Sequence, residues 1–126
     1  MTFRISALFA AILTTVAVTG AAHAADAEAG MKVFGKCKAC HMVKANGKHT
    51  VGPNLHGVVG RKAGSAKGFR YSKAMAESGL TWDEATLDKF LLKPKDLVNK
   101  TRMAFPGLKK DEDRANVIAY LKSLTN

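Results

Sequence analysis

The chain has 126 residues, the length of one domain rather than two. Apolar residues make up 47% and charged residues 24%, which excludes a disordered, a collagen-like or a polytopic membrane protein. With 20 basic and 10 acidic residues, the formal net charge is +10, so a partner with an acidic surface is favoured.

The N-terminal segment predicts an export signal that is removed. Arg4 supplies a positive start, residues 5–22 are uncharged and mostly apolar, and Ala22-His23-Ala24 has the small-x-small pattern of a cleavage site. A retained membrane anchor is the alternative, since about 18 residues are at the lower limit for crossing a bilayer. The Thr, Gly and Ala content favours the signal. We therefore expect residues 1–24 to be a cleaved signal peptide and residues 25–126 to form one domain in a bacterial periplasm.

The first half of the remaining chain predicts one helix and one long loop. The helix begins at Asp26 and places Met31, Phe34 and Cys37 on one apolar face. Residues 42–71 contain a glycine every few positions and keep neither helical nor strand periodicity. A loop of this length in a compact domain requires something else in the interior around which it can wrap.

The second half predicts three further helices. A short helix over 72–78 is closed by Gly79, and Thr81 with Glu84 fits a capping box that opens a helix ending before Pro94. A second loop over 94–110 contains Met103. The last helix starts at Asp111, with apolar positions at helical spacing at Val117, Ile118, Tyr120, Leu121 and Leu124. The expected fold class is all-α, with short helices and long loops.

The strongest chemical signal is Cys37-Lys38-Ala39-Cys40-His41. The spacing C-x-x-C-H is typical of covalent c-type haem attachment, in which two thiols hold the porphyrin and the next His binds the iron. A thioredoxin-like redox pair would need a βαβ context, and a structural zinc site would need two more ligands at suitable spacing. Neither is found in the sequence, so haem is the favoured interpretation. A haem would also fill the interior that the long loops require.

The second axial ligand is less sharply defined by the residues alone. Met42 is adjacent to His41 and cannot reach the opposite face of the haem, and Met31 lies on the helix that leads to the Cys pair, where a core role is expected. Met103 lies in a non-helical loop 62 residues after His41, far enough for the chain to wrap first. Met75, His49 and His56 stay open as alternatives.

An ordered set of motifs resembles class I c-type cytochromes of the bacterial periplasmic cytochrome c2 type. The resemblance covers nearly all of residues 26–124. The matching pieces, in chain order, are CKACH at 37–41, GPNLHG at 52–57, GR at 60–61, GFRYS at 68–72, LTW at 80–82, KP at 93–94, TRMAFPGL at 101–108 and IAYLK at 118–122.

The resemblance implies a cytochrome c fold with one haem c bound covalently by Cys37 and Cys40. His41 and Met103 would be its axial ligands, and the Pro53 carbonyl would orient His41. The propionates would be bound by Arg61, Tyr71 and Trp82, with Thr101 near the distal side, while Gly30, Phe34 and Tyr120 would let the first and last helices cross. The chain departs from its relatives at Phe90 and Met75, where a Tyr and an Asn are common.

The function implied is one-electron transfer, not enzymatic catalysis. The resemblance suggests a soluble, monomeric carrier between a donor of the quinol–cytochrome c reductase type and a terminal oxidase or photosynthetic reaction centre, with no nucleic-acid partner. A thiol or metal protein, and a haem enzyme or sensor with an open distal site, are the alternatives. Basic residues flank the expected haem segments and predict a docking face for acidic partners: Lys36, Lys95, Arg102, Lys109 and Lys110.

Overall fold

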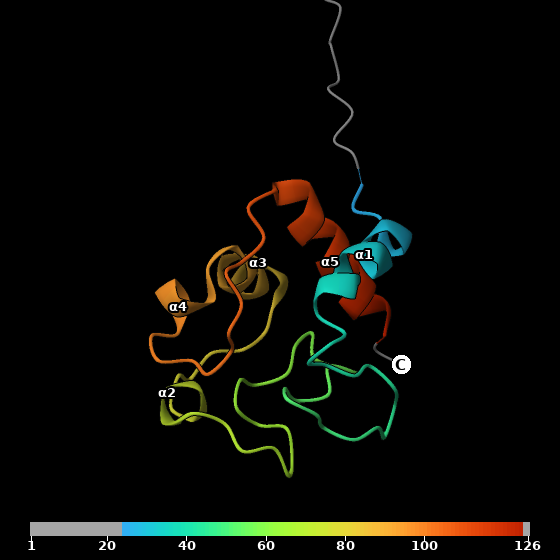
Figure 1. The fold of residues 1–126 in the computed structure, drawn as a ribbon. Helices are drawn as coiled ribbons and strands as arrows, with labels where there is room; N and C mark the ends of the chain where they lie inside the picture. The colour runs from blue at the N-terminus through green and yellow to red at the C-terminus, as the bar shows by residue number, and fades with distance from the viewer. Residues whose placement is uncertain (1–23, 125–126) are drawn as a thin grey trace, which may run out of the picture.

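The computed structural model describes residues 24–124 as short helices joined by long loops (Figure 1). The predicted export signal at residues 1–24 lies outside the described residues, apart from Ala24. The elements are α1 (Ala27–Val33), the 3-10 helix η1 (Phe34–Lys36), α2 (Lys73–Ala76), α3 (Glu84–Leu92), α4 (Pro94–Leu97) and α5 (Asp111–Ser123). The β pairing in this part of the chain is one isolated bridge between Lys62 and Thr81. The all-α prediction is confirmed.

The helices nearest the two ends of the chain, α1 and α5, cross in direct contact (Figure 1). A side chain at Gly30 would collide with the backbone carbonyl of Asn116 on α5, so only glycine permits this close approach. Beside the crossing, the rings of Phe34 and Tyr120 pack with their centroids 5.4 Å apart. The Asn116 side chain also accepts a hydrogen bond of 2.8 Å from the Asp26 amide at the start of α1.

The buried face of α1 differs from the predicted one. Met31 is 53% exposed, whereas Gly30 and Phe34 are buried. The expectation that Met31 belongs to the core was wrong, because α1 is a single short helix whose contact with α5 is centred on its small residue. On α5 the prediction is confirmed, since Val117, Ile118 and Leu121 are all buried.

The segment from Ser78 to Val98 also departs from the prediction. Asp83, not Thr81, is the N-cap of α3: its carboxylate accepts a hydrogen bond of 2.7 Å from the Thr86 amide. Thr81 is instead held in the bridge to Lys62. Pro94 does follow the end of α3, but it also occupies the first turn of α4, so the predicted loop over 94–110 begins with a helical turn.

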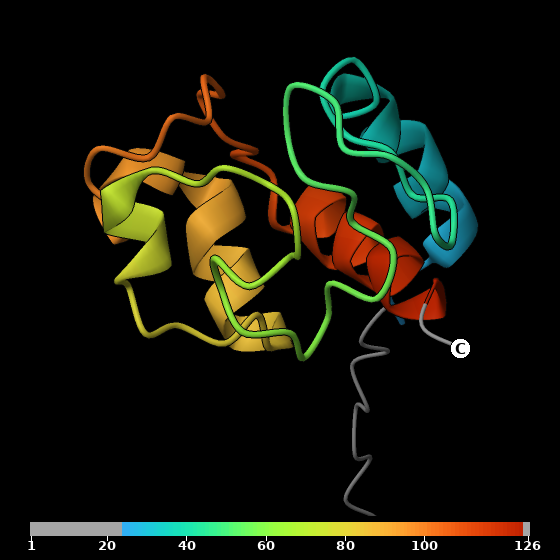
Figure 2. The same cartoon turned by 90° about the horizontal axis from the view of Figure 1, so that it is seen from below.

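The loops form one side of the molecule. Residues 42–71 contain no helix and run across the space between α1 and α5 on one side and α2 and α3 on the other (Figure 2). This confirms the long loop that the glycines predicted. Within residues 24–124, no helix has both the length and the apolar character needed to cross a membrane.

Candidate functional site

The loops and helices enclose an apolar cavity of about 430 Å³. The residues that the sequence predicted for a cofactor site all line it, although they come from six separate motifs: Cys37, Cys40, His41, Pro53, Arg61, Tyr71, Trp82, Thr101 and Met103. A second, more open hollow of about 610 Å³ lies between Ala25, α3 and α5, and none of the predicted site residues lines it. The enclosed cavity is therefore the candidate site.

The turn after η1 brings both thiols and the imidazole to one wall of the cavity. The amides of Cys40 and His41 donate hydrogen bonds of 3.0 and 2.9 Å to the Cys37 carbonyl, which winds the motif into a single helical turn. Cys37 and Cys40 are not joined in a disulfide, so both sulfurs can bond to a cofactor. Burial, together with the neighbouring Cys40, raises the pKa of the Cys37 thiol above its usual value, while Lys36 acts in the opposite direction.

The His41 ring is fixed from the adjacent loop. Its Nδ1 lies 2.7 Å from the Pro53 carbonyl, which can only accept, so Nδ1 carries the proton and Nε2 is the nitrogen left for a metal. Gly52 lies against the same ring, and a side chain at this position would collide with it. The Gly52 amide donates a 2.7 Å hydrogen bond to the Cys40 carbonyl, which holds the loop in place.

Burial lowers the pKa of His41, while the hydrogen bond to Pro53 acts in the opposite direction. A neutral imidazole is the form that binds a metal. The site therefore presents a neutral nitrogen donor in a fixed orientation.

Met103 reaches the cavity from the loop between α4 and α5. The Met103 amide donates a 3.3 Å hydrogen bond to the Thr101 hydroxyl, and the Arg102 guanidinium donates one of 2.6 Å to the Tyr71 carbonyl. The other end of the loop lies on α3, where the Leu108 amide donates to the Leu91 carbonyl at 2.7 Å. Both ends of the loop that carries the Met103 thioether are thus bound to other segments.

The cavity wall contributed by α2 and α3 is apolar. Met75 and Phe90, the two departures from the resemblance, are both buried and both line the cavity. The Trp82 and Phe90 rings pack with centroids 4.8 Å apart. Met75 thus adds a second thioether to the cavity lining.

Polar groups lie along another part of the lining. The Arg61 guanidinium donates to the carbonyls of Asn54 and His56, at 3.1 and 3.4 Å. The Tyr71 hydroxyl accepts a 3.1 Å hydrogen bond from the Ala66 amide. Because that hydroxyl accepts here, its own proton is left to donate to an anionic group.

The other candidate ligands lie elsewhere. Met31, Met42, His49 and His56 do not line the cavity. His49 has a structural role, because its Nδ1 accepts a 2.9 Å hydrogen bond from the Asn54 amide and its Nε2 donates one of 2.9 Å to the Lys67 carbonyl. Met75 is the alternative that stays at the site.

The donor set and the cavity fit a haem. The cavity offers two thiols, an oriented imidazole and a thioether behind apolar walls, which are the groups that hold a c-type haem. In the described part of the chain, no group of three or more His, Cys, Asp or Glu side chains could hold a metal ion by itself. Sequence reasoning missed Gly52, whose role depends on contact with a ring that the sequence does not place beside it.

Proteins of one known family resemble this chain along most of its length. The family model described as Cytochrome c matches residues 27–125. The chain is 57% identical over 98 residues to cytochrome c2 of Rhodomicrobium vannielii, covering 78% of each chain, and 53% identical over 98 residues to cytochrome c2 of Rhodoblastus acidophilus, covering 78% of this chain and 92% of that protein. The structure of cytochrome cH from Methylobacterium extorquens superposes with a TM-score of 0.74 at 49% identity, covering 78% of this chain and 98% of the other.

Proposed function

Because this chain belongs to the cytochrome c family and is a class I member of the c2 type, we propose that it is a periplasmic one-electron carrier whose haem iron is bound by His41 and Met103. Proteins of this family are electron carriers rather than enzymes, and they bind one haem c through two cysteines, here Cys37 and Cys40. When bound, the haem supplies an iron that gains and loses one electron.

The observation that carries the axial assignment is that His41 and Met103 line the same cavity although 62 residues separate them in the chain. His41 would bind through Nε2, since Nδ1 is engaged with Pro53. Met103 is the cavity-lining methionine that lies in a loop rather than in a helix, and its loop is bound at both ends. Met75, by contrast, is buried within α2.

The remaining residues would keep the site dry and rigid. Phe90, Trp82 and Leu91 exclude water from the lining, and a low-polarity surrounding with a thioether ligand favours the ferrous state. Arg61, Tyr71 and Trp82 would hold the propionates, and Thr101 would orient the Met103 segment through its hydroxyl. With both axial positions filled by protein groups, the iron would exchange electrons without binding a substrate.

The axial assignment is tested by Met103→Ala in the haem-loaded protein. The long-wavelength charge-transfer band of a ferric iron–thioether bond should disappear, and the reduction potential should fall, because a harder ligand or water would replace the sulfur. Met31→Ala is the matched control, since Met31 is exposed and lies outside the cavity. An unchanged band in Met103→Ala would refute the assignment, and its loss in Met75→Leu would transfer the role to Met75.

Carbon monoxide binding to the haem-loaded protein distinguishes an electron carrier from a haem enzyme or sensor. A carrier with both axial positions filled should bind carbon monoxide poorly when reduced, and Met103→Ala should bind it readily. Ready binding by the native protein would indicate an open distal position and contradict the proposed function.

The proposed function includes export to the periplasm and docking to membrane-bound redox complexes. Residues 1–24 would be removed as a signal peptide, leaving residues 25–126 as a monomeric periplasmic domain, and the N-terminal sequence of the mature protein tests this. The donor would be a complex of the quinol–cytochrome c reductase type, and the acceptor a terminal oxidase or photosynthetic reaction centre. Acidic faces on these complexes would meet the positive charge of this chain.

A further inference from the structure

Arg114, on the first turns of α5, is a buried charged residue to which the sequence analysis gave no role. Its side chain is 5% exposed, and its guanidinium donates four hydrogen bonds. Two go to carboxylates: Asp88 on α3 at 2.7 Å and Asp111 on α5 at 2.5 Å. The other two go to the backbone carbonyls of Leu108 and Lys109, at 2.8 and 3.0 Å.

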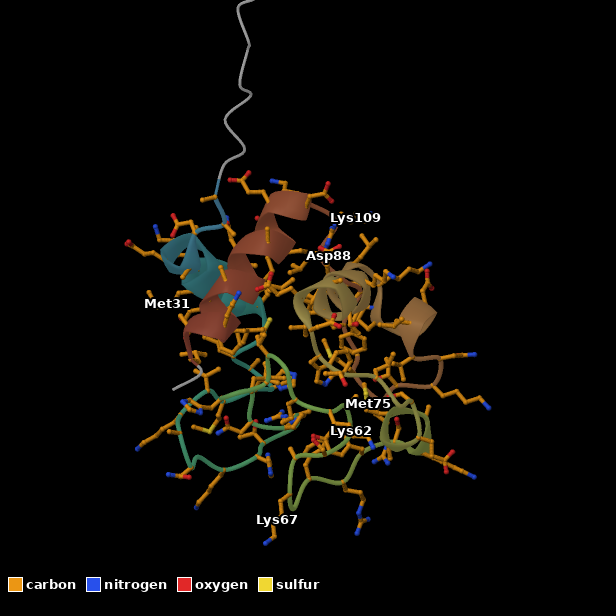
Figure 3. The ribbon with its side chains drawn as sticks, turned by 180° about the vertical axis from the view of Figure 1, so that it is seen from behind. Met31, Lys62, Lys67, Met75, Asp88 and Lys109 are labelled. Atoms are coloured by element: carbon orange, nitrogen blue, oxygen red, sulfur yellow. The ribbon has the colours of Figure 1, made fainter. Side chains whose placement is uncertain are left out.

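Residues 101–110 carry Met103, and we call them the Met103 segment. The two carbonyls lie near the C-terminal end of this segment. Figure 3 shows Asp88 and Lys109 beside one another where this segment meets α3 and α5, and the Arg114 guanidinium joins the two. Gly107 lies against the Leu92 carbonyl at the same place, where a side chain would collide. The guanidinium therefore binds the end of the segment to both helices at once.

We propose that Arg114 is a positioning residue of the electron-transfer site, which holds the Met103 segment closed so that the Met103 sulfur stays on the cavity. The proposal rests on the proposed axial role of Met103. The opposite end of the segment is bound by the Arg102 guanidinium to the Tyr71 carbonyl. Release at Arg114 would leave the α3 end held by the single hydrogen bond from the Leu108 amide to the Leu91 carbonyl.

The chemistry of the guanidinium explains why this position carries Arg. Its planar fork donates to the two carbonyls from Nη1 and to the two carboxylates from Nε and Nη2, whereas a lysine ammonium donates from one nitrogen only. The two carboxylates also compensate the buried positive charge, and the hydrogen bond to Asp88, with that to Asp111, raises the pKa of Arg114 further above its usual value. The guanidinium therefore keeps its positive charge in this contact.

The test measures how often the segment opens in the haem-loaded ferric protein. Added imidazole can bind the iron only when Met103 has left it, so its apparent affinity is proportional to the open population. Arg114→Lys loses the forked contacts and should bind imidazole on the order of tenfold more tightly than the native protein. The amides of Met103 and Leu108 should exchange hydrogen faster by a similar factor, a readout that does not depend on the iron.

Lys122→Gln is the matched control. It removes the ion pair between Lys122 on α5 and Glu84 on α3, which joins the same two helices without touching the segment. This variant should keep native imidazole affinity and native exchange at Met103 and Leu108. If it changed both as much as Arg114→Lys does, general loosening of α5 on α3 would be the cause, and the proposal would be overturned.

A milder variant covers the case in which Arg114→Lys does not fold. Asp88→Asn keeps the shape of the partner and weakens its hold on the guanidinium, so imidazole affinity and segment exchange should rise in the same direction by a smaller factor. Native values in Asp88→Asn would overturn the proposal. If the axial assignment of Met103 is wrong, the charge-transfer band will stay unchanged in Met103→Ala. In that case, amide exchange in the segment still tests the role of Arg114.

Discussion

Gly52 determines how the His41 ring can lie in the cavity wall. A methyl group at Gly52 would collide with the ring, while the Gly52 amide is bound to the Cys40 carbonyl and cannot withdraw freely. The hydrogen bond from His41 to Pro53, the next residue, depends on the same stretch of backbone. The orientation of the imidazole therefore depends on a residue with no side chain.

We expect Gly52→Ala to destabilise the protein by roughly 1–3 kcal/mol, the usual cost of overpacking, and to shift its visible spectrum as the ring turns. Chemical denaturation followed by absorbance measures both effects. Gly35→Ala is the control, because a side chain there meets nothing within 4 Å. Native stability and an unchanged spectrum in Gly52→Ala would show that the ring does not need this contact.

At the residue scale, the sequence predicted the groups with chemistry of their own and missed those that act through geometry. The spacing of Cys37, Cys40 and His41 is local, so one short motif predicted it. Arg114 carries no motif. Asp111, three positions earlier, opens α5 as predicted and also binds Arg114. The burial of Arg114 depends in addition on Asp88 and on a loop distant in the chain.

The start of α3 is capped by a single side chain. The Asp83 carboxylate accepts a hydrogen bond from the Thr86 amide, and this bond lowers the pKa of Asp83 below its usual value of 3.8. A depressed pKa in the folded state means that the charged cap stabilises the fold above pH 3.8, and that this stabilisation is lost as the pH falls through the lowered value.

Asp83→Ala should therefore be less stable than the native protein at pH 7, and the difference should shrink as the pH falls below 4. Urea denaturation across this pH range, followed by circular dichroism, measures it. Asp83→Asn keeps an acceptor without the charge, so it should retain part of the stability and lose the pH dependence. A native-to-Ala difference that stayed constant with pH would mean that the charge of Asp83 is unimportant.

At the element scale, helix existence was predictable and helix boundaries were less so. Periodic apolar residues identified α3 and α5, because those faces cover the core. The sequence predicted Thr81 as the cap of α3, whereas Asp83 caps the helix and Thr81 is held in the bridge to Lys62. That pairing joins segments about 20 residues apart, so local propensity could not detect it.

At the scale of the whole molecule, the described residues that line the cavity include basic ones and no acidic ones. Lys36 and Arg102 line the cavity, and Lys95 lies exposed on α4. Lys62 and Lys67 lie on the 42–71 loop, and Figure 3 shows Lys67 at the end of the molecule opposite Lys109. The fold therefore provides pairs of lysines that match in charge and differ in position.

Lys36→Glu with Lys95→Glu should slow electron exchange with an acidic redox partner at low salt, because steering by such a field changes association rates by about 10 to 10³. The loss should diminish as salt shortens the screening length from about 30 Å at 0.01 M to about 8 Å at 0.15 M. Stopped-flow kinetics at several ionic strengths measures it. Lys62→Glu with Lys67→Glu changes the net charge equally and should do much less. Equal losses would mean that only net charge matters.

Because α1 packs against α5, the fold can form only when the chain has been synthesised almost to its C-terminal end. Residues 27–33 obtain their partner only when residues 111–123 have been synthesised, because α5 is the helix that packs against Gly30. A chain cut short before Asp111 leaves that apolar face uncovered and the end of the Met103 segment without its anchor. Such fragments would stay open to proteases. Resistance to proteolysis would therefore report that the chain has been synthesised as far as α5.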